Sequence, residues 1–383
     1  MHFLTDEERA VQAAIRQFAQ QEIAPQAAAI DEADRFPADL IAQMGRLGWL
    51  GLTVPAEFGG GGAGTLAYLL AIEEVARASA AVATILTVHS TLGAYPIATW
   101  GTDEQRRRFL PRMATGELLG AYALTEPDAG SDAAAQRTRA VRDGDSYVLN
   151  GRKAFVSNGD VAGVTLVFAS TDPSQRSRGI SAFLVERGTP GMLPGAPMKK
   201  LGLHGSPTVQ IAFEDCRVPA ANRLGAEGEG FKIAMQVLDL GRCGIAAQAA
   251  GIAQAALDLA VAYVTGREQF GRPIGAFQGL RFKLADVHTR LSAARLLTYH
   301  AARLRDAGQP FSLEAATAKL HASATAVFAA DTAVQVHGGY GYMREVPAER
   351  LLRDAKITEI YEGTSEIQRV VIARHLLPGV REA

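Results

Sequence analysis

The sequence predicts an α+β fold that is mainly helical, with one block of strands between two blocks of helices. Apolar residues recur at helical spacing in residues 1–120 and again in residues 229–383. Between them, residues 121–228 alternate short β-rich runs with turn residues. Segregated blocks of this kind are typical of separate layers or domains, not of a βαβ sheet. We therefore expect an N-terminal helical domain, a middle β-domain of sandwich or barrel type and a C-terminal helical bundle domain, with these residue bounds.

The N-terminal block begins with a clear helix signal. Thr5 and Glu8 have the spacing of a capping box, in which each side chain bonds to the other residue's backbone N–H. An apolar stripe at helical spacing follows, made of Val11, Ile15, Phe18 and Ile23. Further helices are expected from near Pro37 and over residues 65–81, 83–100 and 103–113. No strand is expected before about residue 120.

A glycine run in this block formally matches a dinucleotide-binding motif. Gly59, Gly61 and Gly64 have the G-x-G-x-x-G spacing. That motif requires a preceding strand inside a βαβ unit, whereas here Pro55 and Phe58 precede it and helical sequence lies on both sides. A loop that joins two helices is the better interpretation, and a nicotinamide-dependent dehydrogenase is kept only as a distant alternative.

The middle block carries hairpin and strand signals. Residues 139–142 and 146–149 flank Asp143-Gly144-Asp145, a typical hairpin turn, and Asn150-Gly151 is expected to form a second turn. Further strands are expected over residues 164–169, 180–186 and 208–213. The connections are expected to hold Pro190, Pro194, Pro197 and Pro219, where proline removes no ladder hydrogen bond.

The C-terminal block ends in a loop that carries Glu362. Three long helices are expected over residues 231–265, 277–307 and 312–336. A shorter pair follows, one helix ending near Ile357 and the next beginning at Thr364, which is a good N-cap. Gly363 lets the chain turn sharply, so a carboxylate is held beside a helix N-terminus that suits an anion or phosphate. The plain alternative is a solvated glutamate in a helix–helix turn.

Three further segments could contact a flat or phosphorylated ligand, and each also has an ordinary structural explanation. The loop 124–132 could grip a heterocycle or phosphate, or simply connect a helix to a strand. Arg267 could hold a pyrophosphate by forked hydrogen bonds, or oppose a helix dipole. The glycines of segment 335–342 could let a ligand lie against bare backbone, although His337 is explained equally well as a helix C-terminal histidine.

Composition excludes several classes of protein. The net charge of −1 over 383 residues gives no broad attraction to nucleic acid. Two cysteines, Cys216 and Cys243, have no metal-like spacing, so we expect neither a zinc site nor a disulfide framework. The longest apolar run, residues 80–88, is too short to span a membrane. The first residues lack the pattern of a signal peptide, and a cytoplasmic location is expected.

Taken together, the motifs resemble the acyl-CoA dehydrogenase family, in the manner of its short- or medium-chain members. The resemblance extends over the whole chain, in order, and depends on residues 124–132, 153–159, 267–271, 335–339 and 360–369. It implies an N-terminal helical domain, a middle β-domain and a C-terminal four-helix bundle, in agreement with the block pattern.

The resemblance implies FAD as the cofactor and assigns two sets of residues to it. The residues expected around the flavin are Tyr122, Leu124, Thr125, Gly130, Ser131, Phe155, Val156 and Ser157. Phe155 stands where the family usually has tryptophan. The residues expected to contact FAD from a neighbouring subunit are Arg267, Gln269, Phe270, Gln278, Gln335, Val336, His337, Gly338 and Gly339. That implies a homotetramer. Thr364, Ser365 and Glu366 are expected on the adenosine side.

Glu362 falls on the position of the family's catalytic base. Some members place the base instead on the first long C-terminal helix, and that position here is Gly241. The substrate-binding residues implied by the resemblance are Ser131, Asp239, Leu240, Gly241, Arg242, Tyr361 and Gly363. The reaction would remove the α-proton of an acyl-CoA and transfer the β-hydride to flavin N5, giving the trans-2-enoyl-CoA. Electrons would pass to an electron-transfer flavoprotein.

Three alternative functions are considered, one within flavin chemistry and two outside it. An oxidase of the same fold would pass electrons to oxygen, as acyl-CoA oxidases or nitroalkane oxidases do, although the nitroalkane branch uses aspartate as its base. The nicotinamide-dependent dehydrogenase depends only on the glycine run. A non-enzymatic helical scaffold would leave the ordered set of motifs unexplained.

Overall fold

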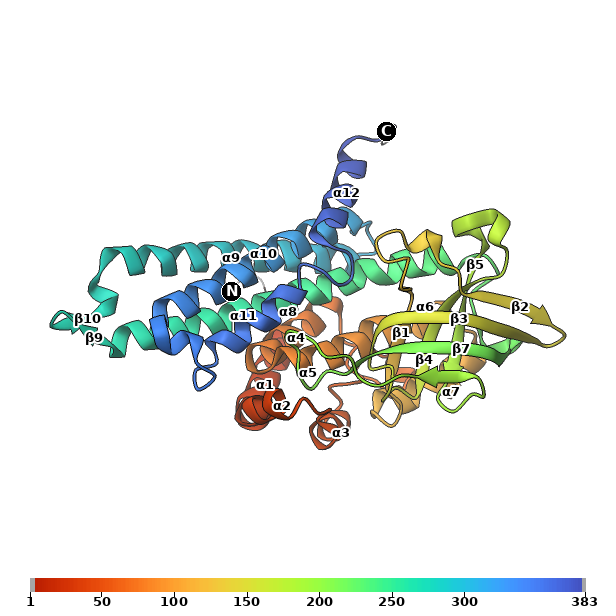
Figure 1. The fold of residues 1–383 in the computed structure, drawn as a ribbon, viewed down its shortest axis with the longest axis horizontal. Helices are drawn as coiled ribbons and strands as arrows, with labels where there is room; N and C mark the ends of the chain where they lie inside the picture. The colour runs from red at the N-terminus through yellow and green to blue at the C-terminus, as the bar shows by residue number, and fades with distance from the viewer. Residues whose placement is uncertain (1–3, 381–383) are drawn as a thin grey trace.

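The structure is a computed structural model that describes residues 4–380. Figure 1 shows the sheet of the middle block at one end of an elongated molecule. The helices α8 (Gly230–Gly266), α9 (Gln278–Asp306) and α10 (Ser312–His337) run side by side toward the other end, where a separate two-stranded hairpin lies. The first three residues, which form part of the segment judged for a signal peptide, lie outside the described residues.

The N-terminal block is entirely helical, as predicted. Its helices are α1 (Asp6–Phe18), α2 (Ala27–Ala33), α3 (Ala38–Arg46), α4 (Thr65–Ala78), α5 (Ala80–Thr87), α6 (Tyr95–Trp100) and α7 (Asp103–Ala114). Two π-helical segments, η1 (Ala19–Ile23) and η4 (Val88–Ala94), continue α1 and α5. The capping box is confirmed, since the N–H of Thr5 donates to Glu8 Oε2 (2.8 Å) and the N–H of Glu8 donates to Thr5 Oγ1 (3.2 Å).

Two details of this block correct or confirm the sequence interpretation. The break expected near residue 82 lies at Ser79, whose extended backbone ends α4 and whose hydroxyl caps α5 by accepting from the N–H of Val82. The glycines Gly59, Gly61 and Gly64 lie in the loop between η3 (Ala56–Phe58) and α4, as predicted.

The middle block contains one eight-stranded sheet. Its strands are β1 (Gly120–Ala123), β2 (Arg139–Asp143), β3 (Ser146–Ser157), β4 (Val164–Ser170), β5 (Ile180–Glu186), β6 (Met192–Pro194), β7 (Thr208–Pro219) and β8 (Arg223–Leu224). The order is β6-β7-β3-β2-β4-β5-β8, with β1 parallel to β4. The predicted hairpin is confirmed, since β2 and β3 pair antiparallel around Asp143 and Ser146.

The sheet folds over itself like a sandwich. Only the pair Arg139 and Ser170 joins the β2 side of the sheet to the β4 side. Side chains from both sides nevertheless share one apolar core, for example Tyr147 and Phe213 with Phe183 and Val167. The sandwich- or barrel-like character expected of this domain therefore arises from one bent sheet.

Two local predictions in this domain are wrong. Asn150-Gly151 forms no turn but lies inside β3, at a bulge in its pairing with β7. Glycine is needed there because an added Cβ at Gly151 would lie 2.5 Å from Thr138 Oγ1. Pro194 and Pro219 end strands β6 and β7 instead of lying in connections.

The C-terminal block is a helical bundle. It comprises α8 (Gly230–Gly266), α9 (Gln278–Asp306), α10 (Ser312–His337), α11 (Ala348–Ile357) and α12 (Ser365–Leu376), with the short strands β9 (Glu268–Gln269) and β10 (Arg272–Pro273) between α8 and α9. The helices α8 to α11 pack together as four, while α12 projects from them (Figure 1).

Helix α8 contributes to three separate apolar cores. Ile233 and Val237 pack with the middle domain, Cys243 packs with the N-terminal helices, and the stretch from Ala246 to Val264 packs with α9 and α10. This single helix therefore links all three parts of the fold.

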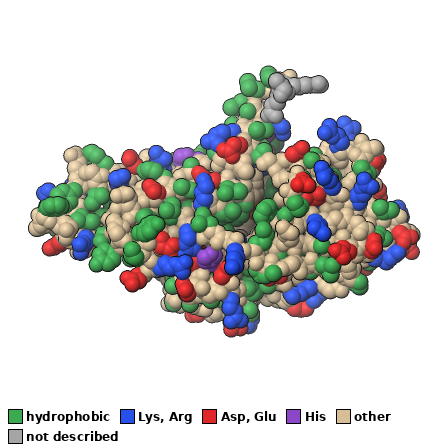
Figure 2. Space-filling view, in the orientation of Figure 1, with side chains coloured by type: hydrophobic (Ala, Val, Ile, Leu, Met, Phe, Trp, Pro, Cys, Tyr) green, Lys and Arg blue, Asp and Glu red, His purple; other side chains and the backbone are tan. Residues whose placement is uncertain are grey.

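Two helical stretches, Ala80–Trp100 and Gly230–Gly266, have the length and apolar content of a membrane-crossing helix. In their most apolar windows, 94% and 67% of residues are buried inside the protein, as expected of core helices. On the face shown in Figure 2, basic and acidic side chains are interspersed, in keeping with the net charge of −1.

Candidate active site

Glu362 lies in a tight turn between α11 and α12. The flanking helices end and begin as predicted, and Thr364 caps α12 by accepting from the N–H of Ile367 (3.3 Å). Glu362 itself has a left-handed backbone (φ 52°), and Gly363 follows with φ 95°. A residue other than glycine adopts this conformation at a cost of about 1–2 kcal/mol, and such strain is concentrated at functional sites.

The carboxylate of Glu362 is withdrawn from water. The residue as a whole is half-buried, but its Oε2 is shielded from solvent and has no hydrogen-bond partner. Burial raises the pKa of Glu362 to about 7, although the nearby cations of Lys319 and Arg242 oppose the rise. These facts exclude the alternative of a solvated surface glutamate and leave a base poised near neutral pH.

Three hydrogen bonds fasten the turn to α8 and α10, and a fourth joins it to α12. The Lys319 ammonium and the Gln368 side-chain amide both donate to the Gly363 carbonyl, each at 2.7 Å. Ser323 donates to the Thr358 carbonyl (2.7 Å), and the Tyr361 hydroxyl donates to Gln248 (2.7 Å). Sequence reasoning missed Lys319, Ser323 and Gln368.

Helix α8 forms the wall that faces the carboxylate. A Cβ added to Gly241 would lie 1.9 Å from Glu362 Oε2, so the missing side chain leaves the space that the carboxylate occupies. The next residue, Arg242, is buried and pairs with Asp239 (2.7 Å), which also accepts from the Ser312 hydroxyl. The structure therefore brings part of the predicted substrate-binding set to the predicted base.

Residues predicted around the flavin lie on two segments of the middle domain that are tied together. The N–H of Ala154 donates to the Thr125 carbonyl (2.8 Å). Lys153, whose side chain is fully buried, donates to the Leu124 carbonyl (2.9 Å), to Glu126 (2.8 Å) and to Gln136 (2.8 Å). The loop 124–132 is therefore held against β3.

The side chains of these segments differ in what they can contact. Phe155 is 62% exposed, with a left-handed backbone, and is free to lie against a ligand. Gly130 and Ser131 are exposed, and Thr125 and Ser157 are half-buried. Val156 is buried in the core of the domain, so only its backbone can line a cofactor. Tyr122 lies near Glu362, whose charge adds to burial in raising the pKa of its phenol, and its hydroxyl donates to the Ala234 carbonyl (3.3 Å).

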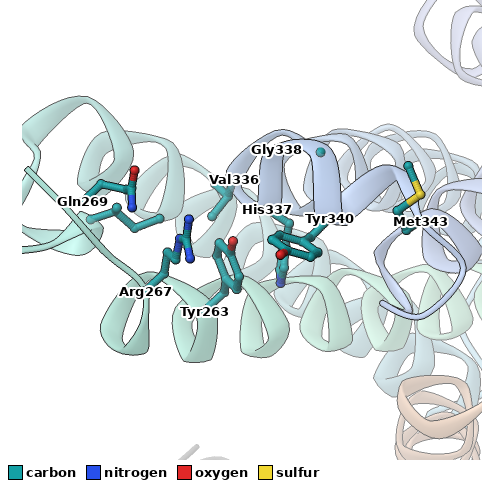
Figure 3. Close-up of a pocket in the computed structure, with 10 residues that line it drawn as sticks. Tyr263, Arg267, Gln269, Val336, His337, Gly338, Tyr340 and Met343 are labelled. Atoms are coloured by element: carbon teal, nitrogen blue, oxygen red, sulfur yellow. The ribbon is translucent and has the colours of Figure 1, made fainter.

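A second group of predicted residues surrounds a cavity at the far end of α8. The cavity holds about 520 Å³, and its lining is drawn in Figure 3. The residues around it are Tyr263, Arg267, Gln269, Ile274, Val336, His337, Gly338, Gly339, Tyr340 and Met343. Tyr263 and Arg267 point from α8 toward the end of α10, and the rings of Tyr263 and His337 stack with centroids 4.1 Å apart.

The cavity suits a phosphorylated ligand. No atom lies within 4 Å of an added Cβ at Gly338 or Gly339, so a ligand can approach bare backbone beside the Arg267 guanidinium. His337 Nδ1 bonds to the Ala333 carbonyl (2.7 Å), which is the ordinary structural role weighed for it. Phe270, Gln278 and Gln335 are exposed nearby but do not line the cavity.

The two groups lie far apart in one chain. Arg267 follows Gly241 by 26 positions along α8 and its C-cap, which at the helical rise of about 1.5 Å per residue is about 39 Å. A single cofactor bound at Glu362 would therefore meet the residues around Arg267 only if a second copy of the chain supplied them. Among residues 4–380, no group of three or more His, Cys, Asp or Glu side chains could hold a metal ion.

Comparison with known families identifies the family to which the chain belongs. The N-terminal, middle and C-terminal domain models of acyl-CoA dehydrogenase match residues 5–117, 121–216 and 228–377, respectively. The chain therefore belongs to the acyl-CoA dehydrogenase family, and it is a flavoprotein oxidoreductase.

Relatives with established names cover almost the whole chain. An acyl-CoA dehydrogenase of Bacillus subtilis is 52% identical over 379 residues, which is 99% of this chain and 100% of the relative. An acryloyl-CoA reductase (NADH) of Anaerotignum propionicum is 50% identical over 98% of this chain and 95% of its own. A short-chain specific acyl-CoA dehydrogenase of Clostridium acetobutylicum is 48% identical, with 97% and 98% covered.

Solved structures agree with this fold. Butyryl-CoA dehydrogenase from Megasphaera elsdenii superposes with a TM-score of 0.96 at 45% identity and covers 97% of this chain and 98% of its own. A chain from a structure described as the electron transferring flavoprotein of Acidaminococcus fermentans gives a TM-score of 0.97 at 48% identity, with 99% and 100% covered. The N-terminal helical, middle β and C-terminal helical arrangement is that of the family.

Proposed function

We propose that the chain is an FAD-dependent dehydrogenase of short acyl-CoA thioesters, forming the trans-2-enoyl-CoA. The observation that supports this most directly is the buried, unpartnered Oε2 of Glu362 facing the missing side chain of Gly241. Burial of a carboxylate in such a place raises its pKa to about 7, which suits a base that takes a proton from a bound ligand. The names of the relatives at about half identity support a short acyl chain.

In the proposed reaction, Glu362 removes the α-proton of the thioester. The α-proton is too weakly acidic for a free carboxylate, so the thioester oxygen must receive hydrogen bonds as negative charge develops. We assign one of these bonds to the backbone N–H of Glu362, as the family resemblance implies. When bound, FAD supplies the acceptor for the β-hydride. The hydrogen bonds of the turn hold the base in place. Holding the substrate in reacting geometry between the base and the flavin can be worth about 7–11 kcal/mol.

We also propose that FAD is shared between subunits of a homotetramer. The loop 124–132 with Phe155 would hold the flavin, and the residues around Arg267 would hold the phosphates of a neighbouring subunit's FAD. The separation of about 39 Å along α8 supports this division. Replacing Arg267 by alanine is expected to weaken FAD retention, measured by flavin absorbance after gel filtration.

We propose an electron-transfer flavoprotein as the electron acceptor. This acceptor is supported by the similar chain in the structure described as the electron transferring flavoprotein of Acidaminococcus fermentans. In the oxidase alternative, the acceptor is oxygen. Steady oxygen consumption with peroxide release by the pure protein would favour the oxidase. We further propose a cytoplasmic location.

The relative named acryloyl-CoA reductase (NADH) favours a second candidate function, in which the same site runs in the direction of 2-enoyl reduction. Glu362 would then return the α-proton instead of removing it. Oxidation of NADH by the purified protein with acryloyl-CoA and an added electron-transfer flavoprotein would support this direction. Reduction of the flavin by butyryl-CoA alone supports dehydrogenation.

The decisive experiment is anaerobic bleaching of the flavin by a series of acyl-CoAs. Glu362→Gln is expected to keep FAD but to lose about a thousandfold in the rate of bleaching, because loss of a general base typically costs about 10²–10⁴. Glu359→Gln is the matched control, since Glu359 lies in the same turn but pairs with Lys356 (2.6 Å). Near-normal bleaching by the Glu362→Gln variant would overturn the proposal.

The rate should also depend on pH in a defined direction. Glu362 works in its ionised form, so bleaching is expected to accelerate as pH rises through about 7, the value to which burial raises its pKa. Stopped-flow rates from pH 5.5 to 9 would measure this. A rate that falls over that range would contradict the role of Glu362 as a base.

A further inference from the structure

Lys319 is a fully buried lysine that the proposed reaction does not yet use. It lies on α10, and its side chain is 0% exposed. Its Nζ donates to the Gly363 carbonyl at 2.7 Å, in the residue directly after Glu362. Burying an ammonium costs several kcal/mol, so a lysine in this place calls for an explanation beyond packing.

The bond to Gly363 places Lys319 at the catalytic turn. The same carbonyl accepts a second bond from the neutral amide of Gln368, also at 2.7 Å. One helical turn beyond Lys319, Ser323 bonds to the Thr358 carbonyl at the start of the turn. Helix α10 therefore holds the chain on both sides of Glu362, and at Gly363 it does so with a charged group where a neutral one is already present.

The charge of Lys319 has no direct ionic partner. Among the described residues, no carboxylate lies within ion-pair distance of its Nζ. Burial lowers the pKa of Lys319 to about 8, while the charge of Glu362 works against that lowering. Of the carboxylates that act on Lys319, Glu362 has the largest effect, and its Oε2 has no hydrogen-bond partner.

The other charged and titratable groups around this pair come from every neighbouring element. Helix α8 contributes Arg242, which is already paired with Asp239. The chain on either side of the turn contributes Glu359 and Glu366 near Lys319. The phenols near Glu362 are Tyr68, Tyr122 and Tyr361, from α4, β1 and the turn itself. Of the two cations near Glu362, Arg242 is paired with a carboxylate, whereas Lys319 is bonded to a backbone carbonyl.

We propose that Lys319 is a positioning residue for the base, in which the buried ammonium fixes the Gly363 carbonyl and favours the ionised form of the Glu362 carboxylate. This inference rests on the proposed role of Glu362. Lys319 acts through Glu362 and the turn, without touching the reacting atoms.

The test uses the holoenzyme and the variants Lys319→Met and Gln368→Leu. Methionine has a similar length without the charge, and the Gly363 carbonyl keeps its bond from Gln368. Gln368→Leu removes the neutral donor to the same carbonyl and leaves the charge, so the pair separates charge from anchoring. If Lys319→Met fails to fold, as judged by thermal unfolding, Lys319→Gln provides a neutral, polar replacement.

Infrared difference spectroscopy with carboxyl-labelled glutamate, referenced to Glu362→Gln, gives the pKa of Glu362 without turnover. In Lys319→Met this pKa is expected to rise by roughly one pH unit, as loss of a nearby opposite charge predicts. Flavin bleaching at pH 6 should then slow about tenfold and should approach the wild-type rate at high pH, where the base is ionised in both proteins. Gln368→Leu is expected to leave the pKa in place.

An unchanged pKa of Glu362 in Lys319→Met would overturn the inference. Equal effects of Lys319→Met and Gln368→Leu on the pH profile would also overturn it, because Lys319 would then be an anchor only. Both results differ from failure of the proposed function, in which Glu362→Gln would keep its bleaching rate.

Discussion

The middle domain and the C-terminal bundle each bury one lysine completely, but they treat the charge differently. Lys153 of the middle domain donates to Glu126, Gln136 and the Leu124 carbonyl, so all three of its donors are used. Lys319 of the bundle bonds to one backbone carbonyl, at Gly363. Burial lowers the pKa of each lysine to about 8, against the opposing charge of Glu126 at Lys153 and of Glu362 at Lys319.

The difference lies in the acidic neighbour. Burial would raise the pKa of Glu126, but Lys153 and the backbone N–H of Arg137 more than offset it, and the pKa lies below its usual range. The pKa of Glu362 is instead raised to about 7. A carboxylate in a satisfied network is a poor base and a good structural tie, whereas one left partly unsatisfied can take a proton. The first network holds the loop 124–132, and the second surrounds the proposed base.

The largest expected effect is at the satisfied pair. Lys153→Met leaves the Glu126 carboxylate buried without its cation, which typically costs about 3–5 kcal/mol. The free energy of unfolding in urea would measure this loss. The double variant Lys153→Met, Glu126→Gln is the control and should recover part of the loss. If Lys153→Met lowered the unfolding free energy by less than about 1 kcal/mol, Lys153 would not differ from Lys319 in its contribution to stability.

An intermediate effect is expected at the wall facing Glu362. In Gly241→Ala the new Cβ would lie 1.9 Å from Oε2 if nothing moved, so the carboxylate must shift. Overpacking costs about 1–3 kcal/mol, and a misplaced base is expected to slow flavin bleaching about a hundredfold. Gly244→Ala is the matched control, because its Cβ would meet Thr87, at 2.9 Å, and not Glu362. Similar rates in the two variants would contradict the assignment.

A smaller loss of stability is expected at Lys319. Lys319→Met removes one hydrogen bond, but it also removes a buried charge that has no ionic partner, and the Gly363 carbonyl keeps Gln368. The unfolding free energy should therefore change by about 1 kcal/mol or less. If Lys319→Met destabilised the protein as much as Lys153→Met, its role would be structural.

The smallest effect is expected at an exposed ion pair of the sheet. Arg217 and Asp143 pair across β7 and β2, with more than half of each side chain exposed. Arg217→Ala should change the unfolding free energy by about 0.5 kcal/mol or less, because water and salt screen such pairs. A loss similar to that of Lys153→Met would show that burial is not what separates these pairs.

The long helices and the turn of Glu362 were predictable because their signals are local. Thr364 as N-cap and Gly363 as the turn residue are enough to place the carboxylate between two helices. The bulge at Asn150-Gly151 was missed because the same dipeptide can form a turn or lie in a strand that pairs with a distant strand. The local sequence does not distinguish these two cases. Strands β6 and β8 are too short to give a periodic signal.

The two lysine networks could not be predicted for a related reason. Lysine is normally exposed, and its partners here are distant in sequence. A signal was present for Lys319, since it shares one helical face with Ala315, Ala322 and Ala326, all fully buried. A charged residue in the middle of an apolar stripe predicts a buried charge, and a buried charge requires polar partners. The roles of the cofactor-binding residues remain predictions from resemblance.

Helix α8 has a consequence for how the protein comes apart. Three apolar cores each include a stretch of this one helix, from Ile233 near its start to Val264 near its end. Melting any of these cores strips packing partners from the other two, so heat or denaturant is expected to weaken the three together. A fragment limited to one domain would expose an apolar helix surface that the intact chain covers.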